Sequence, residues 1–148
     1  LDSLDLKGHE DVLEIGTGSG YFSAVLASLA KSVKSIEIHK ELIDAAKEKI
    51  DALNISNVEL VNVDALNLNF GNKKFDTIVV GCALPVVSED LKRALKKSGK
   101  LFIIVGSKNQ MHATLVERVD EDKWKSKSLF ETYIDLMNGS EPLPEFTF

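Results

Sequence analysis

Three glycines and one acidic residue stand close together near the start of the chain, where residues 11–21 read DVLEIGTGSGY. Gly16, Gly18 and Gly20 follow a short apolar run, and glycine lets a turning backbone approach a ligand with no side chain in the way. Glu14 lies two residues before the first glycine. A glycine-rich turn between a strand and a helix is typical of loops that hold nucleotide cofactors.

The spacing of these glycines separates two classes of cofactor. Dinucleotide-binding loops read G-x-G-x-x-G, and their third glycine lets the helix pack against the strand. Here that position is Tyr21, and the pattern is G-x-G-x-G. An acid beside a cationic amino-acid group is favourable, whereas an acid beside a diphosphate is not. The loop therefore predicts S-adenosylmethionine (SAM) as the cofactor and S-adenosylhomocysteine (SAH) as its product. The alternative is a tight strand-to-helix turn that holds no ligand.

Five apolar runs alternate with helix-like segments, which is the pattern of a parallel sheet covered by helices on both faces. The expected strands are residues 12–15, 33–38, 58–63, 75–80 and 101–105. Two helices are expected at residues 21–30 and 40–53. A third, short helix is expected to begin after Ser88 as its N-cap and to run through Leu91 and Leu95 toward Gly99.

The pattern changes after Gly106. Residues 113–119 and 124–132 are two extended stretches joined by a polar turn, which predicts an antiparallel hairpin at one edge of the sheet. The chain end, residues 142–148, is expected to fold back on the body through its phenylalanines.

Further acids follow the second and third expected strands. Ligands of open α/β sheets bind beyond the carboxyl ends of the strands. Glu37 lies about twenty residues after the first glycine, where a carboxylate accepts hydrogen bonds from ribose hydroxyls. Asp64 follows the next strand and is placed to accept a hydrogen bond from an adenine amino group. Each acid alone could simply face solvent, but with the loop they predict a cofactor site. Its predicted residues are Glu14, Gly16, Thr17, Gly18, Ser19, Gly20, Tyr21, Glu37, Ile38, Asp64, Ala65 and Gly81.

The fourth expected strand leads into residues 81–85, where groups near a transferred methyl would lie. No N-P-P-Y or D-P-P-Y sequence occurs there, which disfavours methylation of an amino group on adenine or glutamine. Cys82 is either a nucleophile for methylation of a pyrimidine carbon or, as we favour, a small buried thiol. His39 either contacts the cofactor or lies on the helix surface. No catalytic residue is assigned.

Composition excludes several other classes of protein. The chain has 148 residues, of which 44% are hydrophobic and 28% charged, as expected for one globular domain. Its single cysteine permits no intrachain disulfide and no cysteine-based metal site, and its histidines show no ligand spacing. A net charge of −5 argues against a broad phosphate-binding surface, so nucleic acid is not an expected partner. No apolar run is long enough for a membrane span, and a cytoplasmic location is the default expectation.

Four segments resemble protein-L-isoaspartate O-methyltransferases. They are VLEIGTGSGY at 12–21, SIEIHKEL at 35–42, FDTIVVGCALPVV at 75–87 and LKKSGKLFIIVG at 95–106. The G-x-A-x-P-V sequence after the fourth strand is the more discriminating part, and SLFET at 128–132 resembles a bacterial branch of the family. The resemblance implies an α/β, Rossmann-like class I SAM methyltransferase core over residues 1–148. It also implies carboxyl O-methylation of L-isoaspartyl residues in damaged proteins or peptides.

The chain departs from the family pattern at two places. The family commonly has Gly-Asp-Gly after the third strand, whereas Asp64 lies between Val63 and Ala65. The family also has an upstream segment that helps to bind the peptide and supplies a serine near the cofactor, and this chain starts at Leu1, just before the first motif. We therefore expect the cofactor core of a longer protein. Two other functions fit the same residues: a SAM methyltransferase acting on RNA or a small metabolite, and a SAM-binding module without catalysis.

Overall fold

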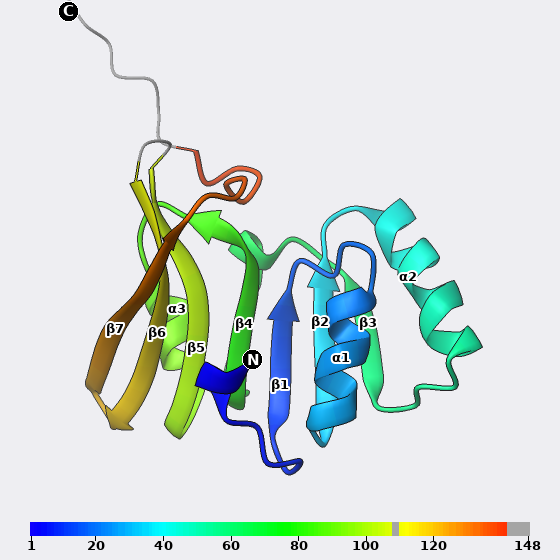
Figure 1. Ribbon diagram of the computed structural model, residues 1–148, viewed down its shortest axis with the longest axis horizontal. Helices are drawn as coiled ribbons and strands as arrows, with labels where there is room; N and C mark the ends of the chain where they lie inside the picture. The colour runs from blue at the N-terminus through cyan, green and yellow to red at the C-terminus, as the bar shows by residue number, and fades with distance from the viewer. Residues whose placement is uncertain (108–109, 142–148) are drawn as a thin grey trace, which may run out of the picture.

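The computed structural model describes residues 1–107 and 110–141, and over these residues seven strands form one sheet (Figure 1). The strand order is β3-β2-β1-β4-β5-β6-β7. The strands are β1 (Asp11–Ile15), β2 (Ser32–Glu37), β3 (Val58–Asn62), β4 (Phe75–Leu84), β5 (Leu95–Ser107), β6 (Gln110–Asp120) and β7 (Lys123–Thr132). The pairs from β3 to β5 are parallel, and β6 and β7 add an antiparallel hairpin. The predicted α/β fold with a C-terminal hairpin is confirmed.

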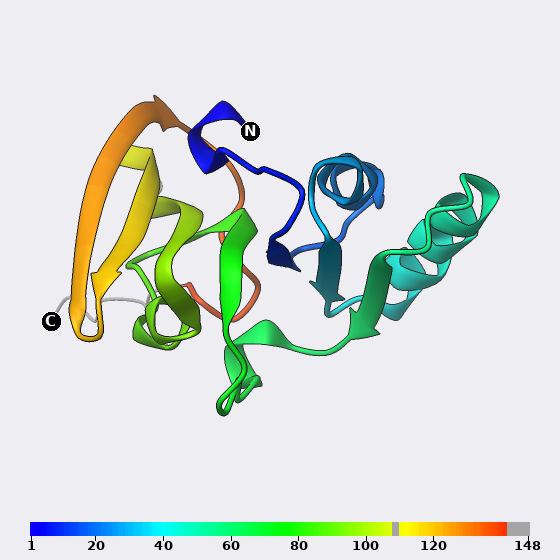
Figure 2. The ribbon, with the colours of Figure 1, turned by 90° about the horizontal axis from the view of Figure 1, so that it is seen from below.

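Helices cover both faces of this sheet. They are α1 (Tyr21–Leu29), α2 (Lys40–Ala52) and α3 (Glu89–Arg93), with short 3-10 turns η1 (Asp2–Leu4) and η2 (Ala65–Asn67). Figure 2 shows α1 on one face of the sheet and α3 on the other. α2 contacts β2 and β3 and buries Ile43, Ala46 and Ile50, which lie on one side of the helix at spacings of three and four.

Two of the three apolar clusters among the described residues pack against opposite faces of β1. Val12 of β1 packs in the cluster with Leu26 of α1, whereas its neighbour Leu13 packs in the cluster with Leu91 of α3. Successive side chains of a strand point to opposite faces, so a strand covered on both faces must be apolar at every such position. Val12 and Leu13 are accordingly 1% and 0% exposed.

The third predicted helix is wrong at its C-terminal end. α3 stops at Arg93, and Leu95 and Gly99 belong to β5. Leu95 pairs with Phe75 and is fully buried, so its helical spacing from Leu91 reflects a shared core and not a shared helix. Between the pairs Phe75–Leu95 and Thr77–Lys100, five steps along β5 match two along β4, and this irregularity was not visible in the sequence.

The fourth strand is longer than predicted, because β4 continues past Val80 to Leu84. Val79 pairs with Phe102 and Ala83 pairs with Ile104, so four steps along β4 match two along β5. The extra residues form a bulge that contains Gly81 and Cys82. Bulges of this kind re-aim side chains beside functional sites.

The strand predicted at residues 101–105 is confirmed but much longer, because β5 runs from Leu95 to Ser107. The other predicted strands and helices are confirmed with boundaries shifted by a few residues, and the hairpin strands are longer than predicted. Within the described residues, no helix is long and apolar enough to cross a membrane. The predicted folding back of residues 142–148 lies outside the described residues.

Gly20, the N-cap residue of α1, lies against Ala46 of α2 and leaves no space for a side chain. It has a φ of 79°, and a Cβ added to it would lie 2.8 Å from the Cβ of Ala46. Gly18 also has a positive φ, of 52°, but a Cβ there meets nothing within 4 Å.

We expect Gly18→Ala to lower the free energy of unfolding by about 1 kcal/mol through backbone strain alone. Gly20→Ala should lower it by roughly 2–4 kcal/mol, since a clash adds to the strain. Urea unfolding measures both losses, and equal losses would contradict this account.

Candidate functional site

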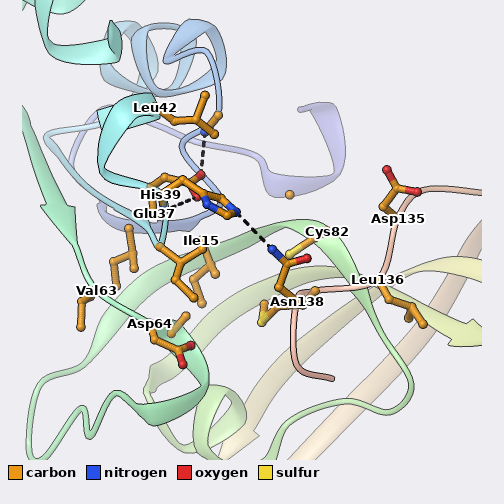
Figure 3. A pocket seen from close by; sticks show the side chains of 17 residues that line it. Ile15, Glu37, His39, Leu42, Val63, Asp64, Cys82, Asp135, Leu136 and Asn138 are labelled. Atoms are coloured by element: carbon orange, nitrogen blue, oxygen red, sulfur yellow. Dashed lines mark hydrogen bonds between the residues drawn. The ribbon is translucent and has the colours of Figure 1, made fainter. Parts of the chain in front are cut away.

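A pocket opens at the carboxyl ends of the parallel strands, beside the point between β1 and β4 where the strand order reverses (Figure 3). Its volume of about 390 Å³ lies in the range of small-molecule sites. The lining residues are Ile15, Gly16, Gly18, Ile36, Glu37, Ile38, His39, Leu42, Val63, Asp64, Ala65, Gly81, Cys82, Asp135, Leu136, Met137 and Asn138.

The pocket brings together many of the residues predicted from the sequence. Those that line it are Gly16, Gly18, Glu37, Ile38, Asp64, Ala65 and Gly81. The other predicted residues, Glu14, Thr17, Ser19, Gly20 and Tyr21, do not belong to its lining. Tyr21, at the start of α1, is 75% exposed. Cofactor binding by all of these residues stays a prediction.

The glycine loop is attached to the end of β2 by its backbone amides. The amides of Gly16 and Thr17 both donate to the carbonyl oxygen of Ile36, at 2.8 and 3.2 Å. Gly16 has a φ of 94°, and a Cβ on it would point at Gly81 of β4, 3.8 Å from its Cα. The two facing glycines therefore leave the floor of the pocket without side chains, where a ligand can approach the backbone.

Glu37 joins the glycine loop to the start of α2. Its Oε2 accepts a hydrogen bond from the amide of Gly18, and its Oε1 accepts one from the amide of His39, both at 3.1 Å. The residue is only 7% exposed. A carboxylate oxygen accepts more than one hydrogen bond, so each oxygen can still receive a hydroxyl from a ligand.

Glu14 lies beneath the loop instead of facing the pocket. It is 1% exposed, and its carboxylate accepts hydrogen bonds from the hydroxyls of Ser23 and Ser35. Thr17 is hydrogen-bonded to Ser35 at 2.6 Å, so the network reaches the loop from below. Burial raises the pKa of the Glu14 carboxyl, while the two serine hydroxyls act to lower it. Glu14 therefore supports the loop from the core, and its predicted contact with a ligand stays a prediction.

Asp64 begins η2 as its N-cap. Its carboxylate accepts hydrogen bonds from the amide of Leu66 at 2.9 Å and from the Asn67 side chain at 2.6 Å. These bonds orient the side chain at the rim of the pocket, and Figure 3 shows it on the far side from Asp135.

The segment of residues 135–138 forms a wall of the pocket that sequence reasoning missed. Its backbone pairs with β4 at Ala83: the Ala83 amide donates to the carbonyl oxygen of Asp135 at 2.9 Å, and the Met137 amide donates to the carbonyl oxygen of Ala83 at 2.8 Å. The Asn138 Nδ2 lies 3.1 Å from the Nε2 of His39, so a hydrogen bond connects this wall to the start of α2 (Figure 3). His39 thus lies at the pocket, although it is also the N-cap residue of α2. No pattern in residues 135–138 signals a pairing with β4.

Comparison with known proteins identifies the family. A family model described as protein-L-isoaspartate(D-aspartate) O-methyltransferase matches residues 1–141. The chain belongs to this family. It is 38% identical to the protein-L-isoaspartate O-methyltransferase of Rhodopseudomonas palustris strain BisB5, over 93% of this chain and 64% of the relative. The chain spans between 56% and 64% of the length of three such curated relatives.

Solved structures of the family share the fold. A protein-L-isoaspartate O-methyltransferase superposes with a TM-score of 0.84 at 25% identity, over 94% of this chain and 45% of that chain. A Plasmodium falciparum structure, titled as a candidate member in complex with SAH, gives a TM-score of 0.75 at 21% identity, over 86% of this chain and 65% of that chain. The fold is therefore that of the Rossmann-like class I SAM methyltransferases.

Cys82 lines the pocket of this isoaspartyl methyltransferase family member, where the bulge of β4 presents it. Burial raises the pKa of the thiol to about 11, and the negative charge of Glu37 adds to the shift. A thiol with this pKa is protonated at neutral pH and is a poor nucleophile, which supports the interpretation of Cys82 as a partly buried thiol. Among the residues that the structure describes, no group of His, Cys, Asp and Glu side chains is arranged to hold a metal ion.

The buried Glu14 makes stability depend on pH. Its native pKa lies above the ordinary value of 4.5, so the native state binds more protons than the unfolded state above that pH. The Glu14 contribution to stability is fully present below pH 4.5 and is lost as the pH rises through the raised native pKa. Glu14→Gln removes this contribution, so its stability relative to the native sequence should rise from pH 4 to pH 8.

Urea unfolding at several pH values measures the difference between the two proteins. Glu48→Gln, at an exposed position of α2, is the matched control and should show no such trend. A difference between Glu14→Gln and the native sequence that is independent of pH would contradict the burial argument.

Proposed function

We propose that this chain is the SAM-binding core of a protein-L-isoaspartate O-methyltransferase. The reaction transfers a methyl group from SAM to the free carboxylate of an L-isoaspartyl residue in a damaged protein or peptide. The observation that carries the proposal is the family match over residues 1–141. We infer that the described residues belong to one cofactor-binding domain.

The lining of the pocket suits the parts of SAM. The Glu37 carboxylate has capacity for the ribose hydroxyls, and Asp64, which also lines the pocket, has capacity for the adenine amino group. Ile38 and Val63 also line the pocket and supply apolar surface for a flat ring. The bare backbone of Gly16, with Gly81 facing it, leaves room for the amino-acid part. The Plasmodium structure, which shares this fold, is a complex with SAH, and this is consistent with a ligand of that kind.

The proposed reaction depends on positioning the methyl donor and the acceptor carboxylate more than on proton transfer. SAM supplies a methyl group activated on a sulfonium. A carboxylate with a pKa of about 4 is ionised at neutral pH, so it attacks the methyl carbon without help from a general base. The protonated Cys82 thiol is consistent with a site that provides no base. What the chain must do is hold the two reactants in line and exclude water, and the bulge of β4 is the place where the acceptor would meet the methyl group.

The proposal predicts methylation that distinguishes two isomeric peptides. The full-length protein, incubated with SAM labelled on its methyl group, should transfer label to a peptide with an L-isoaspartyl residue. Transfer to the same peptide with a normal aspartyl residue should be lower by at least about 100-fold, because only one carboxylate is placed in line with the methyl group. Scintillation counting of the recovered peptide measures the transfer. Transfer to the isoaspartyl peptide that does not exceed transfer to the aspartyl peptide would reject the proposal.

The type of bond formed separates this function from its rivals. A methyl ester is cleaved by mild alkali, so the label should leave the peptide as volatile methanol. A methylated nitrogen or carbon, as in RNA or many small metabolites, would retain its label under the same treatment. Retained label would therefore contradict carboxyl O-methylation even if transfer occurred.

A further inference from the structure

The charged side chains that line the pocket are all of one sign. Glu37, Asp64 and Asp135 are lining residues, and no Lys or Arg within residues 1–107 or 110–141 lines the pocket with them. His39 is the one lining residue in this part of the chain that can gain a positive charge. A ligand in the pocket therefore lies close to carboxylates, and no Lys or Arg among the described lining residues offsets their negative charge.

Glu37 should contribute most to the negative electrostatic potential inside the pocket. It is buried, whereas Asp64 is partly exposed and Asp135 is exposed, and solvent screens a buried charge least. Hydrogen bonds from the amides of Gly18 and His39 hold both of its oxygens in place. The charge is consequently fixed at the junction of the glycine loop and α2, beside the space that the cofactor would occupy.

The influence of Glu37 extends across the floor of the pocket. Cys82 belongs to β4, which is separated from β2 by β1 in the sheet. After burial, the charge of Glu37 is the next cause that raises the pKa of the Cys82 thiol. Both residues line the pocket, so a positive charge on a ligand held there lies within reach of the negative charge of Glu37.

We propose that the Glu37 carboxylate discriminates between methyl donor and product by charge, lowering the Kd of SAM relative to the Kd of SAH. This inference rests on the proposed function. The two ligands share adenine, ribose and amino acid, and they differ by one methyl group and one positive charge on sulfur. A hydrogen bond from ribose to Glu37 is common to both ligands and cancels from the ratio of their Kd values. The attraction of the carboxylate for the sulfonium does not cancel.

The test is a comparison of ligand ratios. Calorimetry with the full-length protein measures the Kd of SAM, of SAH and of sinefungin, an analogue that carries an amine in place of the methylsulfonium. Glu37→Gln should lower the ratio Kd(SAH)/Kd(SAM) by about fivefold, as expected for a charge several ångströms away in a partly buried site. The ratio Kd(SAH)/Kd(sinefungin) should fall similarly. Glu48→Gln on the exposed side of α2 should leave both ratios unchanged.

Two further variants separate charge from contact and from folding. Glu37→Asp keeps the charge but shortens the side chain, so all three ligands should bind more weakly while the ratios stay within about twofold of native. Glutamine at position 37 turns an amide NH₂ group toward the amide of Gly18 or His39. If thermal unfolding shows that Glu37→Gln does not fold, the measurements are made on Glu37→Ala, which removes the side chain. The two Kd ratios are expected to fall by the same factor in this variant.

The pKa of the Cys82 thiol measures the effect of the Glu37 charge in the absence of any ligand. Mass spectrometry of the peptide that contains Cys82 follows the alkylation of this cysteine by iodoacetamide, and its pH dependence measures the pKa of Cys82. The pKa should be lower in Glu37→Gln than in the native protein. Native-like ratios in the neutral variants, or an unchanged Cys82 pKa, would overturn the inference while leaving the proposed function standing. Failure of the native protein to bind either SAM or SAH would overturn both.

Discussion

The attachment of the glycine loop to the end of β2 is the interaction on which the rest of the site depends. Three backbone amides of the loop donate to β2, two of them to the Ile36 carbonyl and one to the Glu37 side chain. From below, the buried Glu14 binds serines of both α1 and β2. These bonds set where the loop passes under the pocket and where α1 begins. They also place the Glu37 carboxylate, since one side chain serves the loop and α2 together.

The same carboxylates that favour a cationic cofactor disfavour an anionic acceptor. An isoaspartyl carboxylate that approaches the bulge of β4 moves toward Glu37 and Asp135, and like charges repel. Under the proposed function, the affinity for the peptide must therefore come from contacts with the rest of the peptide and not from its reacting carboxylate. Once the methyl group has moved, the acceptor is a neutral ester and the sulfur has lost its charge. The loss of charge on sulfur removes an attraction and favours release of SAH, whereas the change from carboxylate to ester removes a repulsion, so release of the methylated peptide gains nothing from these charges.

Much of this arrangement could be predicted because it depends on neighbours along the chain. Apolar runs and helical stripes were enough to place β1 to β3, α1 and α2, since each pattern repeats within a few residues. Glu37 and Asp64 could be assigned to one edge of the sheet because parallel strands end at the same side. The glycines could be placed in the turn before α1, because positive φ angles at three alternate positions suit no other residue as well.

The sequence by itself thus determined the sheet, its covering helices and the edge of the sheet at which the pocket opens. Only the tertiary structure decided which side chains line that pocket. Glu14 turns into the core because Ser23 and Ser35, distant in sequence, supply its hydrogen bonds there. Gly81 and Cys82 reach the pocket because β4 and β5 differ in length between two paired positions. Asn138 meets His39 across 99 positions of the chain. Such contacts depend on register and on the packing of remote segments, and no local pattern of residues records either.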